Sequence, residues 1–144
     1  PVRDERGVPV RDERGSAALE TVILVPGFML FIALMVAGAR LHLARGEVVD
    51  AAAGGARAAS LEVSAAAASR AAREHVVREL HGTCSPVVAT DTVQFARPVG
   101  TAARVSVQVR CEVGFTDVVL PGLPGRIVVT GEADQILDSY RRRR

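Results

Sequence analysis

The first pattern in the chain is a run of nineteen residues without a charge, from Thr21 to Ala39. A helix rises 1.5 Å per residue, so about 20 apolar residues cross the hydrocarbon core of a bilayer. A cleavable secretory signal has a shorter apolar stretch, of roughly 7 to 15 residues, and a small-residue cleavage site after it. Ala37-Gly38-Ala39 keeps that alternative open, but the length of the run predicts a membrane-spanning helix over residues 16–45.

A second helical pattern follows, and it predicts an Ala-rich helix over residues 46–82. Its apolar positions recur every three or four residues. They are Leu61, Ala65, Ala68, Ala72, Val76 and Leu80. Gly46 and Gly54-Gly55 are predicted weak points of the helix. Gly82, with Pro86 shortly after it, predicts the helix end near His81.

The period then changes from about 3.6 to 2, which is typical of strands. From Ala103 to Phe115 apolar residues occupy the odd positions and polar residues alternate with them, which places Cys111 on the inward face of a strand. Further strands are predicted for residues 87–97, with Val93 and Phe95 inward, and for residues 126–136. The pattern predicts an α+β fold, in which the long N-terminal helix continues into the Ala-rich helix. That helix packs on a three-stranded antiparallel sheet within residues 83–140.

Charge and composition exclude several classes of function. The net charge of +2 is too small to indicate a nucleic-acid partner, and the one basic cluster, residues 141–144, reads as a solvated tail. His75, His81 and Cys84 have no spacing typical of a metal site. No nucleophile elbow, glycine-rich loop or pair of acids indicates catalysis. We therefore expect no enzymatic activity, cofactor, metal or small-molecule substrate.

Basic residues predict the orientation of the span. Four arginines precede it, whereas only Arg40 and Arg45 follow closely, so the N-terminus is expected in the cytoplasm. Residues beyond Arg40 would then lie outside the cytoplasmic membrane, where Cys84 and Cys111 can form and keep a disulfide. Such a bond closes a loop of about 27 residues and stabilises the fold by roughly 3.5 kcal/mol through loop-closure entropy.

The segment before the span, residues 1–15, contains the repeat PVRDERG, at residues 1–7 and again at residues 9–15. Its charges cancel and it offers no core, so we expect a disordered cytoplasmic leader. Glu20 then lies at the start of the apolar run, where an ionised group is costly to bury unless it meets a partner. Alternatively, Glu20 is a helix-start acid that complements the helix dipole by about 0.3–1 kcal/mol. Pro26-Gly27 predicts a kink in the helix, although a proline is also tolerated in straight membrane helices.

These features together resemble the N-terminus of type IV pilins and pseudopilins. The features are a charged leader that ends in Gly15, the small Ser16, Glu20 as the fifth residue after that glycine, and a long apolar helix. RGSAALETVILVPGFMLFIALMVAGARL is more similar to TadE-like proteins, minor pseudopilins of tight-adherence (Flp) pilus systems, including a proline soon after the glutamate. One departure is Thr21, because an aromatic residue often follows the glutamate in related pilins.

The resemblance implies a processing site and a docking residue. A prepilin peptidase would cut between Gly15 and Ser16, and Glu20 would pair with the N-terminal amine of a neighbouring subunit. The implied partners are the peptidase, other pilin-like subunits, the pilus assembly machinery and the membrane. The implied location is the bacterial cytoplasmic membrane, in a single pass, with association with a pilus at the cell surface. The alternative is an uncleaved signal-anchored protein whose small outer domain binds a ligand or partner.

Overall fold

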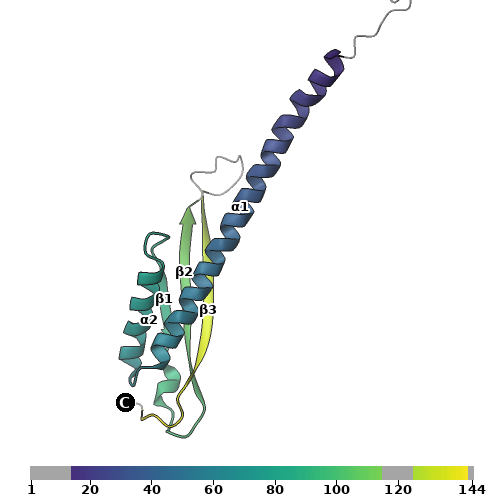
Figure 1. The fold of residues 1–144 in the computed structure, drawn as a ribbon. Helices are drawn as coiled ribbons and strands as arrows, with labels where there is room; N and C mark the ends of the chain where they lie inside the picture. Colours follow the sequence, from purple (N-terminus) through teal and green to yellow (C-terminus); the bar gives the residue numbers. More distant parts are fainter. Residues whose placement is uncertain (1–13, 115–124, 143–144) are drawn as a thin grey trace, which may run out of the picture. The chain divides into compact units, whose positions relative to one another are not determined.

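The structure is a computed structural model that describes residues 14–114 and 125–142, with only the backbone described for residues 14–19 (Figure 1). The chain forms two compact units, Pro1–Val36 and Ala37–Arg144. The elements are α1 (Arg14–Ser60), α2 (Ala65–Glu79), β1 (Val87–Asp91), the 3-10 helix η1 (Val93–Ala96), β2 (Ala103–Gly114) and β3 (Arg126–Leu137). The predicted α+β class is confirmed.

The first unit contains the N-terminal part of α1. Every residue from Glu20 to Val36 is exposed, except the half-buried Ala33. Among the described residues, α1 contains the one stretch that is long and apolar enough to cross a membrane. A helix that is apolar on all sides and not covered by protein is suited to lipid as its solvent.

The second unit is built on an antiparallel sheet of order β1-β2-β3. β2 is the central strand, and its pairing with β3 is continuous from Ala103↔Leu137 to Gly114↔Arg126. Alternate β2 side chains are buried in one core with side chains of α1, α2 and η1. These inward residues are Ala103, Val105, Val107, Val109 and Cys111.

The helix layer consists mainly of alanine, so α1, α2 and the sheet approach one another closely. The fully buried alanines are Ala51, Ala52, Ala56, Ala59, Ala68 and Ala72. At Gly55 an added Cβ would lie 2.9 Å from Val76 Cγ2, and at Gly131 it would lie 2.7 Å from the Val48 carbonyl oxygen. Small residues therefore set the spacing between these layers, since each extra methyl group would have to displace a neighbour.

The helix does not break at the weak points that the sequence predicts. α1 continues through Gly46, Gly54 and Gly55 and ends at Ser60, and the break falls at residues 61–64. Leu61, predicted in the apolar stripe, is instead exposed in this break. Ser64 begins α2 as its N-cap, because its hydroxyl accepts a hydrogen bond from the Ala67 N–H at 3.3 Å. The end of α2 agrees with the prediction, and Gly82 has the expected positive φ of 88°.

The first predicted strand is shorter than expected. β1 ends at Asp91, whose carboxylate oxygen accepts a hydrogen bond from the Val93 N–H at 3.0 Å. This local turn diverts the chain into η1, so residues 93–96 do not continue the strand. Phe95 is buried as predicted, but the prediction that Val93 points inward is wrong, since Val93 is 79% exposed.

The disulfide between Cys84 and Cys111 is present, as predicted. The two Cα atoms are 5.9 Å apart, within the usual range for such a bond. Cys84 follows α2, and Cys111 is buried on the inner face of β2. The bond therefore ties the end of the helix layer to the central strand.

Candidate functional site

The candidate site is the start of α1. The helix begins at Arg14, so Gly15 and Ser16 lie in its first turn, and Glu20 follows Ser16 by four residues. Residues four apart lie on the same face of a helix, about 6 Å apart along its axis. The Glu20 side chain is exposed. Among the described residues, none forms a hydrogen bond or ion pair with it. The leader, residues 1–13, lies outside the described residues.

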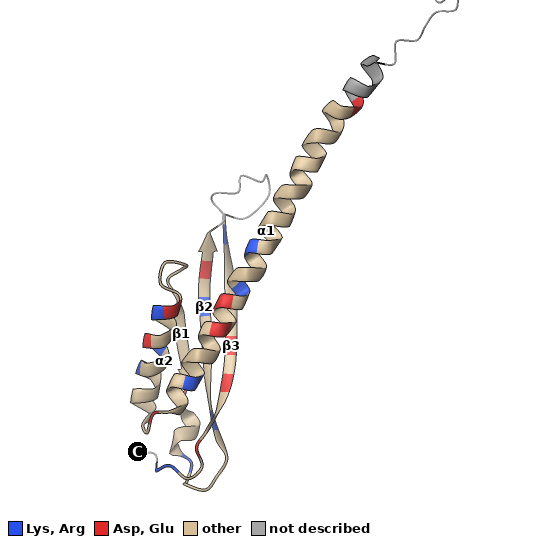
Figure 2. Ribbon diagram, in the orientation of Figure 1, with Lys and Arg blue, Asp and Glu red and all other residues tan. Residues whose placement is uncertain are grey.

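The helix that follows Glu20 has no charge until Arg40. In Figure 2 this part of α1 is tan, whereas charged positions recur along its later turns. Nineteen residues of helix measure about 28 Å, close to the roughly 30 Å of a bilayer hydrocarbon core. Glu20 thus lies at one end of a stretch that matches the membrane thickness, and Arg40 lies at the other.

Pro26 lies inside α1, and the helix continues on both sides of it. Proline has no N–H to donate to the carbonyl four residues earlier, so this turn lacks one backbone hydrogen bond. Gly27, next to it, has no heavy atom within 4 Å of an added Cβ. A kink at Pro26-Gly27 stays a prediction.

A comparison with known families now adds to this geometry. Residues 15–57 match the family model described as TadE-like protein. The resemblance seen in the sequence is therefore confirmed over this segment. No curated protein and no solved structure matches the chain.

The TadE-like segment begins at Gly15 and ends three residues before the end of α1. It contains Ser16, Glu20, the apolar stretch and the Ala-rich part of α1. The match covers 43 of the 144 residues of the chain. The apolar helix fits a single-pass membrane anchor.

The other candidate residues, His75, His81, Cys84 and Cys111, follow residues 15–57 in the sequence. Cys84 is bonded to Cys111, so its thiolate is not available to a metal together with His75 and His81. Within the described residues, no group of three or more His, Cys, Asp and Glu side chains could hold a metal ion.

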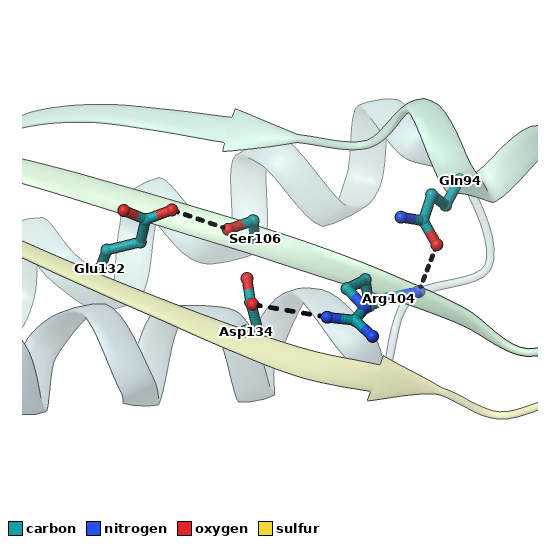
Figure 3. Close-up of polar contacts among 5 residues, drawn as sticks. All are labelled: Gln94, Arg104, Ser106, Glu132 and Asp134. Carbon is teal, nitrogen blue, oxygen red and sulfur yellow. Dashed lines mark hydrogen bonds and ion pairs between the residues drawn. The ribbon is translucent and has the colours of Figure 1, made fainter.

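The face of the sheet away from the helices carries a polar surface that was not predicted from the sequence (Figure 3). There Arg104 approaches Asp134 at 3.9 Å, and Arg126 approaches Glu112 at 3.8 Å. The Ser106 hydroxyl also donates a hydrogen bond to Glu132 at 3.5 Å. The signal available in the sequence was the alternation of polar residues in the strand predicted from Ala103 to Phe115, which was used only to predict the strand itself.

Proposed function

We propose that this TadE-like protein is a minor pseudopilin, an assembly subunit of a Tad pilus system that is processed after Gly15 and docked through α1. One observation carries the proposal: the TadE-like match begins at Gly15 and covers the uncharged stretch from Thr21 to Ala39, which a single acid, Glu20, directly precedes. In this proposal the chain works by assembly and not by catalysis. Its partners are a prepilin peptidase, other pilin-like subunits and the assembly machinery.

Cleavage between Gly15 and Ser16 would create a positive charge at the start of the helix. The new amine of Ser16 and the carboxylate of Glu20 would lie on one face of α1, one turn apart. A neighbouring helix of the same kind, shifted along its axis by about one turn, would bring its amine level with Glu20.

The membrane makes this pairing selective. An ionised side chain costs about 2.5–3.5 kcal/mol at the centre of a membrane helix on insertion scales, and this value is an upper bound for Glu20, which lies at the end of the apolar stretch. An amine and a carboxylate that pair in a medium of low dielectric offset part of each other's desolvation. A subunit docked out of register would leave both charges unpaired. We therefore assign Glu20 a role in setting the position of the subunit along its neighbour.

The proposed topology places the N-terminus in the cytoplasm and the second unit outside the membrane. The arginines that precede the span support this orientation. The disulfide between Cys84 and Cys111 supports it as well, because disulfides persist outside the reducing cytoplasm.

Processing is tested by co-expression of the full chain with a prepilin peptidase, followed by intact-mass measurement and N-terminal sequencing. The expected N-terminus is Ser16. Gly15→Phe should block cleavage, because a bulky residue replaces the glycine before the cut. Gly7→Phe is the matched control, since Gly7 ends the first copy of the same heptapeptide, and it should leave cleavage unchanged. An intact leader in the wild-type chain would favour the uncleaved signal-anchored alternative.

Docking is tested with Glu20→Gln, which keeps the shape of the side chain and removes its charge. We expect the variant to insert into the membrane as the wild type does, and its recovery with the assembled pilus subunits to fall at least tenfold. Glu47→Gln is the control, because Glu47 is an exposed acid of α1 beyond the apolar stretch. If Glu20→Gln is recovered as well as the wild type, Glu20 has no docking role.

A further inference from the structure

An open groove lies on the outer face of the sheet, beside the ends of β2 and β3 that flank residues 115–124. Its volume is about 580 Å³. It is lined by Ser85, Val87, Arg110, Glu112, Gly114, Arg126 and Val128. Two arginines and one acid therefore face the groove, together with two valines that are largely exposed, Val87 at 66% and Val128 at 58%.

Two contacts within the second unit show which residues of α1 lie beside the groove. Gly131 of β3 touches the backbone of Val48. Further along, Arg141 donates a hydrogen bond to the Leu61 carbonyl, and Leu137 borders the same hollow as Ser60. From Gly131 to Leu137 the strand advances about 20 Å, and from Val48 to Ser60 the helix advances about 18 Å. α1 and β3 therefore run in the same direction.

The same rises place the start of β3 beside the end of the apolar stretch. From Gly131 back to Arg126 the strand covers about 16 Å, which corresponds to about 11 residues of helix. Arg126 therefore lies near the level of Ala37, which is buried within this unit. The first charge of α1 beyond the apolar stretch, Arg40, lies at nearly this level. The groove thus lies at the level where a helix spanning the bilayer would emerge into the headgroup region.

The charges at this level differ from those on the rest of the sheet. On the outer face of the sheet, Arg110 and Arg126 lie toward this end of the unit. On α1, Arg40 and Arg45 lie toward the same end, and the acids Glu47 and Asp50 follow them. The one acid in the groove, Glu112, is 3.8 Å from Arg126, and both side chains are more than half exposed, so this pair adds little stability and can rearrange. The outer-face acids Asp91, Glu132 and Asp134 lie further along the strands, away from this end.

We propose that this groove binds the phosphate of an anionic phospholipid headgroup, in the leaflet where α1 leaves the membrane. The Arg110 and Arg126 guanidinium groups bind the phosphate oxygens, as arginine forks do, and Val87 and Val128 contact the apolar part of the lipid next to the headgroup. The contact holds the second unit against the membrane surface. The proposal rests on α1 crossing a bilayer and not on cleavage at Gly15, so a failure of either proposal leaves the other standing.

The test measures the accessibility of a single engineered thiol in the full-length protein. The two native cysteines are bonded to each other, so a new cysteine is the only free thiol in the chain. Val128→Cys places the thiol at the wall of the groove. Ile136→Cys is the matched control, since Ile136 is a 77% exposed residue on the same face of β3, about 26 Å along the strand. Intact-mass measurement confirms that the native disulfide is retained in each variant.

Each variant is placed in nanodiscs of phosphatidylcholine alone or with one third phosphatidylglycerol, and labelled with a membrane-impermeant maleimide. We expect the labelling rate of Val128→Cys to fall at least fivefold with phosphatidylglycerol, and that of Ile136→Cys to stay the same. Adding Arg110→Gln and Arg126→Gln to Val128→Cys should abolish this protection. Arg104→Gln, which removes an outer-face arginine near the other end of the sheet, should preserve it.

Three results would overturn the proposal. Equal labelling of Val128→Cys in both lipids would show that no anionic lipid occupies the groove. Protection that persists without Arg110 and Arg126 would show that the arginines do not bind the headgroup. Equal protection by glycerol phosphate added to phosphatidylcholine nanodiscs would show that the groove binds a free phosphate and not the membrane.

Discussion

The substitution Gly131→Ala tests whether α1 and β3 are in direct backbone contact. Gly131 lies in β3 opposite Val109, and it is buried against α1. An added Cβ would lie 2.7 Å from the Val48 carbonyl oxygen, 2.8 Å from its carbonyl carbon and 2.9 Å from the Val49 nitrogen. These are backbone atoms, so no side-chain rotation relieves the clash, and the helix must move away from the strand.

The size of the effect follows from that movement. An ordinary contact of 3.4 Å requires the helix to retreat by about 0.7 Å at this point. Overpacking of this kind costs typically 1–3 kcal/mol. Part of the cost is offset, since alanine restricts the unfolded chain more than glycine does, by about 0.4–1 kcal/mol. We expect the free energy of unfolding to fall by about 1–2 kcal/mol and the melting temperature to fall by about 5–10 °C.

The measurement is thermal unfolding of the full chain in detergent micelles, followed by the far-ultraviolet circular dichroism of the sheet. Gly46→Ala is the control, because Gly46 lies within α1 with no heavy atom within 4 Å of an added Cβ. That variant should be more stable than the wild type by about 0.5–1 kcal/mol, the usual gain of alanine over glycine inside a helix. A Gly131→Ala variant as stable as the wild type would refute the close approach of α1 to β3.

Two further predictions concern the core. Replacing both Cys84 and Cys111 by alanine should lower the free energy of unfolding by about 3.5 kcal/mol, since the bond spans 27 residues. Dithiothreitol should destabilise the wild type similarly and leave the double variant unchanged, and a wild type that is insensitive to reduction would contradict this prediction. Phe95→Ala should cost about 3–5 kcal/mol because the ring is buried, whereas Val93→Ala should change stability by less than 0.5 kcal/mol because Val93 is exposed. Equal effects of the two substitutions in urea denaturation would show that η1 is oriented differently.

The elements that were predicted correctly are those whose pattern of apolar and polar residues is compatible with only one kind of secondary structure. An uncharged run of nineteen residues predicts one long apolar helix, and α1 contains the whole run. The strict alternation from Ala103 to Val113 can bury one face only as a strand, and β2 is the central strand of the sheet. Cys111 lies on the buried face of that alternation, as predicted.

The secondary-structure predictions were wrong where the same residue type occurs in two kinds of local structure. Gly54 and Gly55 resemble helix breakers by propensity, but the helix keeps them because α2 packs directly over them. Val93 follows the alternation of a strand, yet the carboxylate of Asp91 turns the chain before it. In both places a tertiary contact or a local hydrogen bond outweighed a preference of about 1 kcal/mol or less.

The sequence alone determined the long apolar helix, the similarity of its start to TadE-like proteins, and the alternation of the central strand. These features depend on composition and spacing along a single element, and they can be recognised without any neighbour. Only the tertiary structure decided that the glycines of α1 and β3 are contact points. It also decided that Arg110 and Arg126 share a groove near the end of the apolar stretch. Such relations join segments far apart in the chain, and they arise when the layers pack.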